Sequence, residues 1–324
     1  MKALYISGPG QDNLTFGDLP EPSLQEPTDV IVRVHTTAMN RLDVFRKDGT
    51  HGVSPTKFPY IGGSEYAGEI AEVGPDVTQF KVGDRVFGTG AYTFAQYARI
   101  GSPGSGPHQR PPVHMPDGLS YEEAAAIPIS FCMAWHMLHC KGNLKDGEDV
   151  LVMAAGSGTG SAGIQMAKAA GARVITGSSS DEKLEKARAL GADEVINYQQ
   201  NPEFATPVRD LTNGLGVDFV YESIGGPVWD QCFASTKRGG RIVICGVTGG
   251  HKTSLHLGQL WMREMSIIGC VNEPEKDLED VVRLLDSGSI KGVVDSVLPL
   301  NNADQAYDRM KGRDFFGKIV LTIP

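Results

Sequence analysis

Three alternating glycines interrupt an apolar run in the stretch VLVMAAGSGTGSAGIQMAK, residues 150–168. A helix-forming run of small residues follows these glycines. A strand that turns tightly into a helix presents backbone N–H groups and a positive dipole to a phosphate. The stretch therefore predicts a dinucleotide site, and a glycine-rich strand–helix turn without a ligand is the alternative. The candidate contacts are the residues of the turn: Gly156, Ser157, Gly158, Thr159 and Gly160.

Strand and helix patterns alternate on both sides of this turn. The helical patterns cover 160–171 and 180–191. This βαβ order predicts an α/β protein with a doubly wound, open parallel sheet. The expected strands are 149–155, 172–178, 194–198, 218–225 and 239–247. Gly246 and Val247 end the last of them at the carboxyl edge of the sheet, where a cofactor binds.

The flanking sequence has a different pattern. The first hundred residues indicate a β-rich domain, since VIVRVHTTAMN at 30–40 alternates apolar and polar residues and GEIAEVGPDVTQFKVGDRVFG at 68–88 reads as strands punctuated by glycine and proline. Residues 101–116 hold three glycines and five prolines, so we expect an exposed loop there. Ser120 and Glu123 form a capping box that begins a helix, and Pro128 predicts a kink or restart. A helix over 277–290 and strands over 293–300 and 317–324 end the chain.

Composition limits the partners. The net charge of −9, without a long basic run, disfavours nucleic acid and anionic lipid. No apolar run is long enough to span a membrane, and the N-terminus lacks the pattern of a signal peptide. The five cysteines form no CxxC pair, which is typical of reduced thiols in the cytoplasm.

The end of the second strand of the parallel sheet selects the nucleotide. NAD-selective proteins usually place an acidic residue there to bind the ribose hydroxyls. Here Ser178 and Ser179 leave room, and no carboxylate stands at the strand end. Asp181 follows, and we expect it to be the N-cap of the next helix, with ribose binding as the alternative. Because Lys183 can reach a 2′-phosphate, the sequence predicts NADPH.

Several motifs together resemble the medium-chain dehydrogenase/reductase superfamily, and within it the quinone oxidoreductase and enoyl reductase branch. They are GSEYAGEIAEVG at 63–74, VGDRV at 82–86, the glycine turn, LGADEVINY at 190–198 and FGKIVL at 316–321. The resemblance implies a GroES-like catalytic domain formed by both chain ends and a Rossmann NADPH-binding domain between them. The expected boundaries are 1–122, 123–270 and 271–324. In NADPH-using relatives, residues matching Lys183 and Tyr198 contact the 2′-phosphate.

The departures from the family are informative. Zinc dehydrogenases of the superfamily carry a cysteine and a histidine where this chain has Asn40 and Ser64. Because a catalytic zinc needs three protein ligands, we expect a protein without zinc. His136, His139 and Cys140 lie close in sequence, but we expect a structural cluster there. The resemblance places Asn40 beside the nicotinamide. His51 falls near the substrate, where histidine can donate a proton, although a solvent-exposed loop position is the alternative.

A reaction without zinc favours substrates that delocalise their own negative charge. We therefore expect NADPH-dependent hydride transfer to a quinone or to the activated C=C of an α,β-unsaturated carbonyl. Asn40 and His51 are the catalytic candidates, and Lys318 is expected to be structural. The alternatives are a zinc-dependent alcohol dehydrogenase with relocated ligands and a non-catalytic NADPH-binding or structural protein. The family analogy also implies a homodimer.

Overall fold

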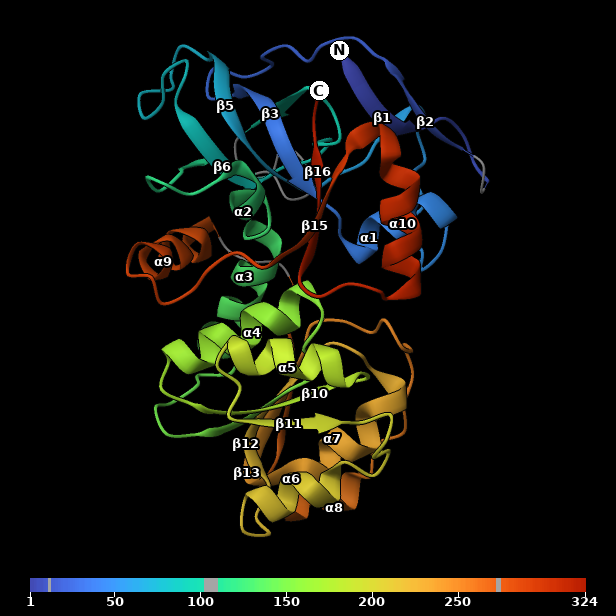
Figure 1. The fold of residues 1–324 in the computed structure, drawn as a ribbon, viewed down its shortest axis with the longest axis vertical. Coiled ribbons are helices and arrows are strands. Elements are labelled where there is room, and N and C mark those ends of the chain that lie inside the picture. Colours follow the sequence, from blue (N-terminus) through green and yellow to red (C-terminus); the bar gives the residue numbers. More distant parts are fainter. Residues whose placement is uncertain (11–12, 102–109, 272–274) are drawn as a thin grey trace. The chain divides into compact units, whose positions relative to one another are not determined.

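The computed structural model describes residues 1–10, 13–101, 110–271 and 275–324. The chain divides into two compact units (Figure 1). Unit 1 comprises Met1–Ile129 and Gly292–Pro324, and unit 2 comprises Ser130–Lys291. Within the described residues, no helix combines the length and the apolarity that crossing a membrane requires.

Unit 1 is β-rich and contains both chain ends. Its helices are α1 (Arg41–Asp48), α2 (Tyr121–Ala125) and α10 (Ala303–Gly312), with the 3₁₀ turn η3 (Leu300–Asn302). Its strands are β1 (Lys2–Ile6), β2 (Leu14–Asp18), β3 (Val30–Ala38), β4 (Tyr60–Ile61), β5 (Glu65–Val73), β6 (Arg85–Thr89), β7 (Tyr97–Ile100), β8 (Val113–His114), β15 (Val294–Pro299) and β16 (Lys318–Thr322).

The strands of unit 1 pair in two sheets among the described residues. The smaller has the order β2-β1-β4, and the larger has the order β15-β16-β3-β5-β6-β8, with β7 also paired to β3. The C-terminal strand β16 pairs antiparallel with β3, with Val320 opposite Ala38. The sequence pattern predicts a half-buried strand here, but β3 is buried at nearly every position and only Arg33 is exposed, because the strand pairs with β5, β7 and β16 inside the sheet. The tail of the chain is therefore an integral part of this unit.

Unit 2 is an α/β layer structure. Its helices are α3 (Pro128–Trp135, which begins at the end of unit 1), the π-helix η1 (His136–Lys141), α4 (Gly158–Ala169), α5 (Asp181–Ala189), α6 (Ala205–Leu211), the 3₁₀ turn η2 (Gly226–Val228), α7 (Trp229–Ser235), α8 (Leu257–Met262) and α9 (Glu275–Asp286). Its strands are β9 (Asp149–Val152), β10 (Arg173–Ser178), β11 (Glu194–Asn197), β12 (Val217–Glu222), β13 (Thr236–Ile244) and β14 (Ser266–Gly269).

The six strands of unit 2 form one parallel sheet in the described part of the chain. Their order is β11-β10-β9-β12-β13-β14. Successive strands are therefore added on one side of β9 up to β11 and on the other side of β9 from β12 onward. Figure 1 shows α4 and α5 on one face of the sheet and α6 and α7 on the other. Buried Leu151, Val220 and Trp229 belong to the core between the sheet and the second helix pair. The predicted doubly wound parallel sheet is confirmed.

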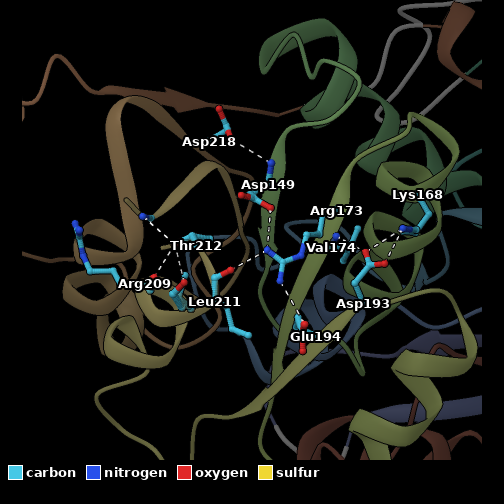
Figure 2. Close-up of polar contacts among 12 residues, drawn as sticks. Asp149, Lys168, Arg173, Val174, Asp193, Glu194, Arg209, Leu211, Thr212 and Asp218 are labelled. Carbon is cyan, nitrogen blue, oxygen red and sulfur yellow. Dashed lines mark hydrogen bonds and ion pairs between the residues drawn. The ribbon is translucent and has the colours of Figure 1, made fainter. Parts of the chain in front are cut away.

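Polar side chains join the amino ends of neighbouring strands in this sheet (Figure 2). Arg173, the first residue of β10, pairs with Asp149 at the start of β9 and Glu194 at the start of β11, at 3.4 and 3.3 Å. Its guanidinium also donates to the Leu211 carbonyl at 2.9 Å. The Asp149 N–H donates to the Asp218 carboxylate on β12 at 3.1 Å. Side chains thus occupy this edge, and the glycine turn lies at the opposite one.

Several details differ from the sequence-based expectations. Of the expected loop 101–116, residues 102–109 lie outside the described residues, but Val113–His114 forms β8 and Met115 is buried. The helix restart predicted at Pro128 is confirmed, because α2 ends at Ala125 and α3 begins at Pro128.

The compact units divide at 129/130 and 291/292 rather than at the expected 122/123 and 270/271. The first difference arises because α2 packs against β3 and β5 of unit 1. The second arises because α9 is bound to η1 of unit 2 through an ion pair between Asp277 and His136.

Candidate active site

The glycine turn links β9 to α4 through tightly packed backbone. Ser157 is the N-cap of α4, and its hydroxyl accepts the Gly160 N–H at 2.9 Å. A Cβ on Gly160 would lie 2.1 Å from the Ala154 carbonyl oxygen, so only glycine fits there. The Thr159 carbonyl is held by the Tyr221 hydroxyl at 3.0 Å. The turn thus presents the first N–H groups of a twelve-residue helix at the carboxyl edge of the sheet.

The end of β10 lacks an acidic side chain, as predicted. Ser178 is buried and Ser179 is exposed, and Lys183 lies in the first turn of α5 with its side chain partly exposed. The N-cap of α5 is Ser180, whose hydroxyl accepts the Lys183 N–H. The prediction that Asp181 caps this helix is therefore wrong, because the extended backbone ends at Ser180 and Asp181 is already helical.

Asp181 is occupied by other partners. Its two carboxylate oxygens accept hydrogen bonds from the side-chain amides of Asn197, at 2.7 Å, and Gln200, at 3.1 Å. Tyr198, the next residue after β11, donates its backbone N–H to the Ser178 carbonyl at 3.1 Å. The site where a Cβ of Gly177 would stand is 3.2 Å from the Tyr198 ring. Tyr198 therefore lies against the end of β10, near the segment that carries Lys183.

Gly246 and Val247 follow β13 at the same edge. A Cβ on Gly246 would approach the Ser223 carbonyl oxygen to 3.0 Å, and Val247 Cα lies 3.2 Å from where a Gly225 Cβ would be. The carboxylate of Glu222, the last residue of β12, accepts hydrogen bonds from the backbone N–H groups of Ile224 and Gly225. Burial raises the pKa of the Glu222 carboxyl, and these backbone N–H groups oppose that effect. The predicted cofactor residues of unit 2 thus gather at the carboxyl ends of β9, β10, β11 and β13.

A separate buried network in unit 1 surrounds Asn40. The Lys318 ammonium donates to Asn40 Oδ1 and pairs with Glu65 Oε1, each at 2.7 Å. Asn40 Nδ2 donates to the same Glu65 oxygen at 2.8 Å. The second carboxylate oxygen of Glu65 accepts the Ile129 N–H at 2.9 Å. Glu65 and Lys318 are both buried, so the pair lies in a low-dielectric environment.

This network fixes the orientation of the Asn40 side chain. Its oxygen faces a cation and its amide nitrogen faces an anion, so the amide is polarised in one direction. Its other Nδ2 neighbour, the Ala38 carbonyl, is 3.4 Å away, which is longer than an ordinary hydrogen bond. Sequence reasoning missed Glu65 and assigned Lys318 only a structural role. A signal was available for Lys318, the one charged residue of the otherwise apolar strand β16, but not for Glu65, since β5 carries three glutamates.

His51 and Ser64 lie outside this network. His51 is exposed, stacks on Phe45 with ring centroids 3.8 Å apart, and has its Nδ1 3.0 Å from the Thr50 hydroxyl. Ser64 is buried, and its hydroxyl accepts a 3.4 Å contact from the Arg46 guanidinium. The two positions where zinc relatives carry ligands therefore hold neutral side chains that face Lys318 and Arg46. Neither side chain supplies the thiolate or imidazole that zinc commonly binds, and the Asn40 oxygen already accepts a hydrogen bond from the Lys318 ammonium.

Both parts of the chain match known families. Residues 26–137 match the alcohol dehydrogenase GroES-like domain, and residues 158–287 match the zinc-binding dehydrogenase family. A zinc-type alcohol dehydrogenase-like protein of Schizosaccharomyces pombe is 33% identical, with 97% of this chain and 96% of that protein covered. An acryloyl-coenzyme A reductase of Sulfurisphaera tokodaii is 30% identical, with 99% of each covered. A quinone oxidoreductase of Pseudomonas aeruginosa is 30% identical, with 96% of each covered.

Solved structures show the same fold. The crystal structure of an NAD-dependent alcohol dehydrogenase superposes with a TM-score of 0.92 at 34% identity, covering 100% of both chains. A mycobacterial protein complexed with NADPH superposes with a TM-score of 0.86 at 27% identity, covering 99% of this chain and 100% of that one. The predicted combination of a Rossmann sheet and a GroES-like domain is confirmed. The chain belongs to the medium-chain dehydrogenase/reductase superfamily.

Proposed function

We propose that this protein is a zinc-independent, NADPH-dependent oxidoreductase that transfers hydride to a quinone or to the activated C=C of an α,β-unsaturated carbonyl. The observation that carries the proposal is the buried contact of Asn40 with Lys318 and Glu65. The Lys318 ammonium is hydrogen-bonded to the Asn40 amide, at a position that the family resemblance assigns to a zinc ligand. Its positive charge would repel a second cation at that position. The names of the acryloyl-coenzyme A reductase and quinone oxidoreductase relatives agree with this substrate class.

The residues at the carboxyl edge of unit 2 fit a dinucleotide. The turn from Gly156 to Gly160 would hold the pyrophosphate, since Gly160 leaves no room for a side chain. Lys183, with Ser178, Ser179 and Tyr198, would hold the 2′-phosphate, and Gly246 and Val247 would line the nicotinamide end. Asp181 does not compete for the ribose because Asn197 and Gln200 bind its carboxylate. When bound, NADPH supplies a hydride, that is, one hydrogen nucleus and two electrons.

The chain's own contribution is polar stabilisation and proton supply. Hydride addition to a conjugated carbonyl or quinone places negative charge on the carbonyl oxygen. The Asn40 amide, polarised by Lys318, can donate a hydrogen bond to that oxygen. The proton that completes the product comes from water or from His51, whose exposed position permits exchange with solvent.

We also propose that the protein is a homodimer. Helix α8 carries three exposed apolar side chains, Leu257 at 66%, Trp261 at 72% and Met262 at 62%, and Val271, just beyond the outer strand β14, is 77% exposed. Large apolar surfaces of this kind commonly mark interfaces, and an outer strand offers unpaired backbone groups. The same surface of a second copy of the chain would cover the exposed apolar side chains and the unpaired backbone groups of the outer strand.

The reaction is tested with metal-stripped protein. We expect oxidation of NADPH with quinones, enones or enoyl thioesters as acceptors, little with simple ketones, and the same rate after chelation. The loss of reduced-nicotinamide absorbance measures the rate. Activity found only with simple alcohols or ketones, and only with zinc restored, would falsify the zinc-independent reaction. Tight NADPH binding without turnover on any acceptor would instead indicate a non-catalytic protein.

Lys183→Ala tests the nucleotide preference. Loss of a charge-assisted hydrogen bond to the 2′-phosphate should raise the Kd for NADPH roughly ten- to a hundredfold, with the Kd for NADH unchanged. Fluorescence titration measures both constants. Lys186→Ala is the matched control, because Lys186 lies on the same helix and pairs with Glu182. Equal effects of the two variants, or a parent that prefers NADH, would contradict the assignment.

Asn40→Leu tests the proposed hydrogen-bond donor. Removing one donor of this kind costs roughly 10²-fold in kcat, and we expect that loss without a large change in the KM for NADPH. Steady-state kinetics measure it, with the circular dichroism spectrum and Tm as checks of folding. A folded Asn40→Leu variant with the kcat of the parent contradicts the role of Asn40.

The same experiment extends to Lys318 as a positioning residue. Lys318→Met alone leaves the buried Glu65 carboxylate without its cation, which should cost about 3–5 kcal/mol of unfolding free energy. The double variant Lys318→Met/Glu65→Leu removes both charges and should recover most of that stability. Its kcat should stay low because the Asn40 amide has lost both orienting partners. A double variant with full kcat would show that the charge pair is structural only.

Trp261→Glu tests the dimer. A charge in the middle of the exposed apolar surface should disfavour association, so the variant should be monomeric where the parent is dimeric. Sedimentation velocity at several concentrations measures this. Glu264→Gln removes a charge just beyond α8 that pairs with Arg238 and is not an apolar surface residue, so this control should leave the dimer intact. A parent that sediments as a monomer refutes the proposal directly.

A further inference from the structure

Three potential metal ligands converge in unit 2, and none of them belongs to the glycine turn. His136 and Cys140 come from the π-helix η1, and Asp277 comes from the first turn of α9. Among the described residues, this is the group of three or more histidine, cysteine and acidic side chains whose ligand atoms all lie within 4.8 Å of one another. Their residue types are those that bind zinc.

The distances suit a tetrahedral ion. Zinc bonds of 2.0–2.3 Å place neighbouring ligand atoms about 3.3–3.8 Å apart. Cys140 Sγ lies 3.7 Å from Asp277 Oδ1, and His136 Nδ1 lies 2.9 Å from Asp277 Oδ2. The two pairs use different oxygens of the Asp277 carboxylate, and all the ligand atoms lie within 4.8 Å of one another, so small side-chain shifts would let the three residues share an ion.

The buried atoms of the cluster lack satisfied hydrogen bonds. Among the described residues, neither His136 Nδ1 nor Asp277 Oδ2 has a hydrogen-bond partner, although both are buried. They form a 2.9 Å ion pair with each other, and neither forms a hydrogen bond with a third group in the described part of the chain. Unsatisfied buried polar atoms are rare in native proteins and often mark an ion or water. A cation between the two atoms would satisfy both.

The local backbone supports this arrangement. A π-helix is uncommon and frequently occurs at functional sites. Within η1, His136 and Cys140 are four residues apart, so both face α9. His139 does not join them, since its ring stacks on Trp135 with centroids 4.0 Å apart. The sequence expectation was a structural cluster of His136, His139 and Cys140 without a metal, and it did not include Asp277.

We propose that His136, Cys140 and Asp277 form a zinc site that fastens the start of α9 to η1. A thiolate, an imidazole and a carboxylate together favour zinc over magnesium or calcium, which prefer oxygen ligands. Cys140 is exposed, so water can complete the coordination as the fourth ligand. The site contains no residue of the proposed hydride-transfer machinery, and its test is independent of that reaction.

Stoichiometric metal binding tests the site. Chelator-treated, reduced protein should bind one zinc ion per chain in a competition titration. Cobalt should give the charge-transfer band of a thiolate ligand. Zinc at 100 times its Kd should raise the Tm by roughly 5–10 °C. Cys140→Ser, at an exposed position that tolerates the change, should abolish the cobalt band and raise the Kd for zinc more than tenfold.

Two further variants separate a metal site from a simple ion pair. His139→Gln is the matched control, and its stoichiometry, cobalt band and Kd should equal those of the parent. Asp277→Asn should lower the Tm much more in the presence of zinc than in its absence. The proposal is overturned if the parent binds no stoichiometric zinc, if Cys140→Ser keeps the cobalt band, or if Asp277→Asn lowers the Tm equally with and without zinc.

Discussion

The buried ion pair between Lys318 and Glu65 is the interaction on which unit 1 depends. It joins the last strand of the chain to β5, and through Asn40 it reaches the loop between β3 and α1. Each charge would be costly alone in the interior, so the three side chains are stable only together. The charge pair adds to the pairing of β16 with β3 in holding the C-terminal tail within unit 1, and it sets the orientation of the amide that we assign to the substrate oxygen.

Unit 2 separates its structural and ligand-binding contacts between opposite edges of one sheet. Ion pairs and hydrogen bonds of Arg173 and Asp149 join the amino ends of the strands (Figure 2). At the carboxyl ends, glycines such as Gly160 bring backbone close to backbone and leave N–H groups available to an anion. Parallel strands make this division possible, because all carboxyl ends meet at one edge.

Much of the fold and part of the candidate site could be predicted from local patterns. Hydrophobic periodicity located β9, α4, β10 and α5 in unit 2, and the absence of an acidic residue at Ser178 and Ser179 was visible in the sequence. The helix cap was predicted one residue late, at Asp181 instead of Ser180, because both are good caps and only the backbone conformation distinguishes them. Long-range pairs were not predictable: Asn40 with Lys318 and His136 with Asp277 are separated by more than a hundred residues.

The sequence by itself determined the order of strands and helices, the position of the glycine turn and the absence of an acidic residue at the end of β10. Those features depend on residue type and on neighbours within a few positions. Only the tertiary structure decided that Lys318 faces Asn40, that Asp181 is bound by Asn197 and Gln200, and that Asp277 completes a cluster on η1. Such contacts depend on how distant strands and helices are packed, and side-chain periodicity carries no information about which distant partner a polar group meets.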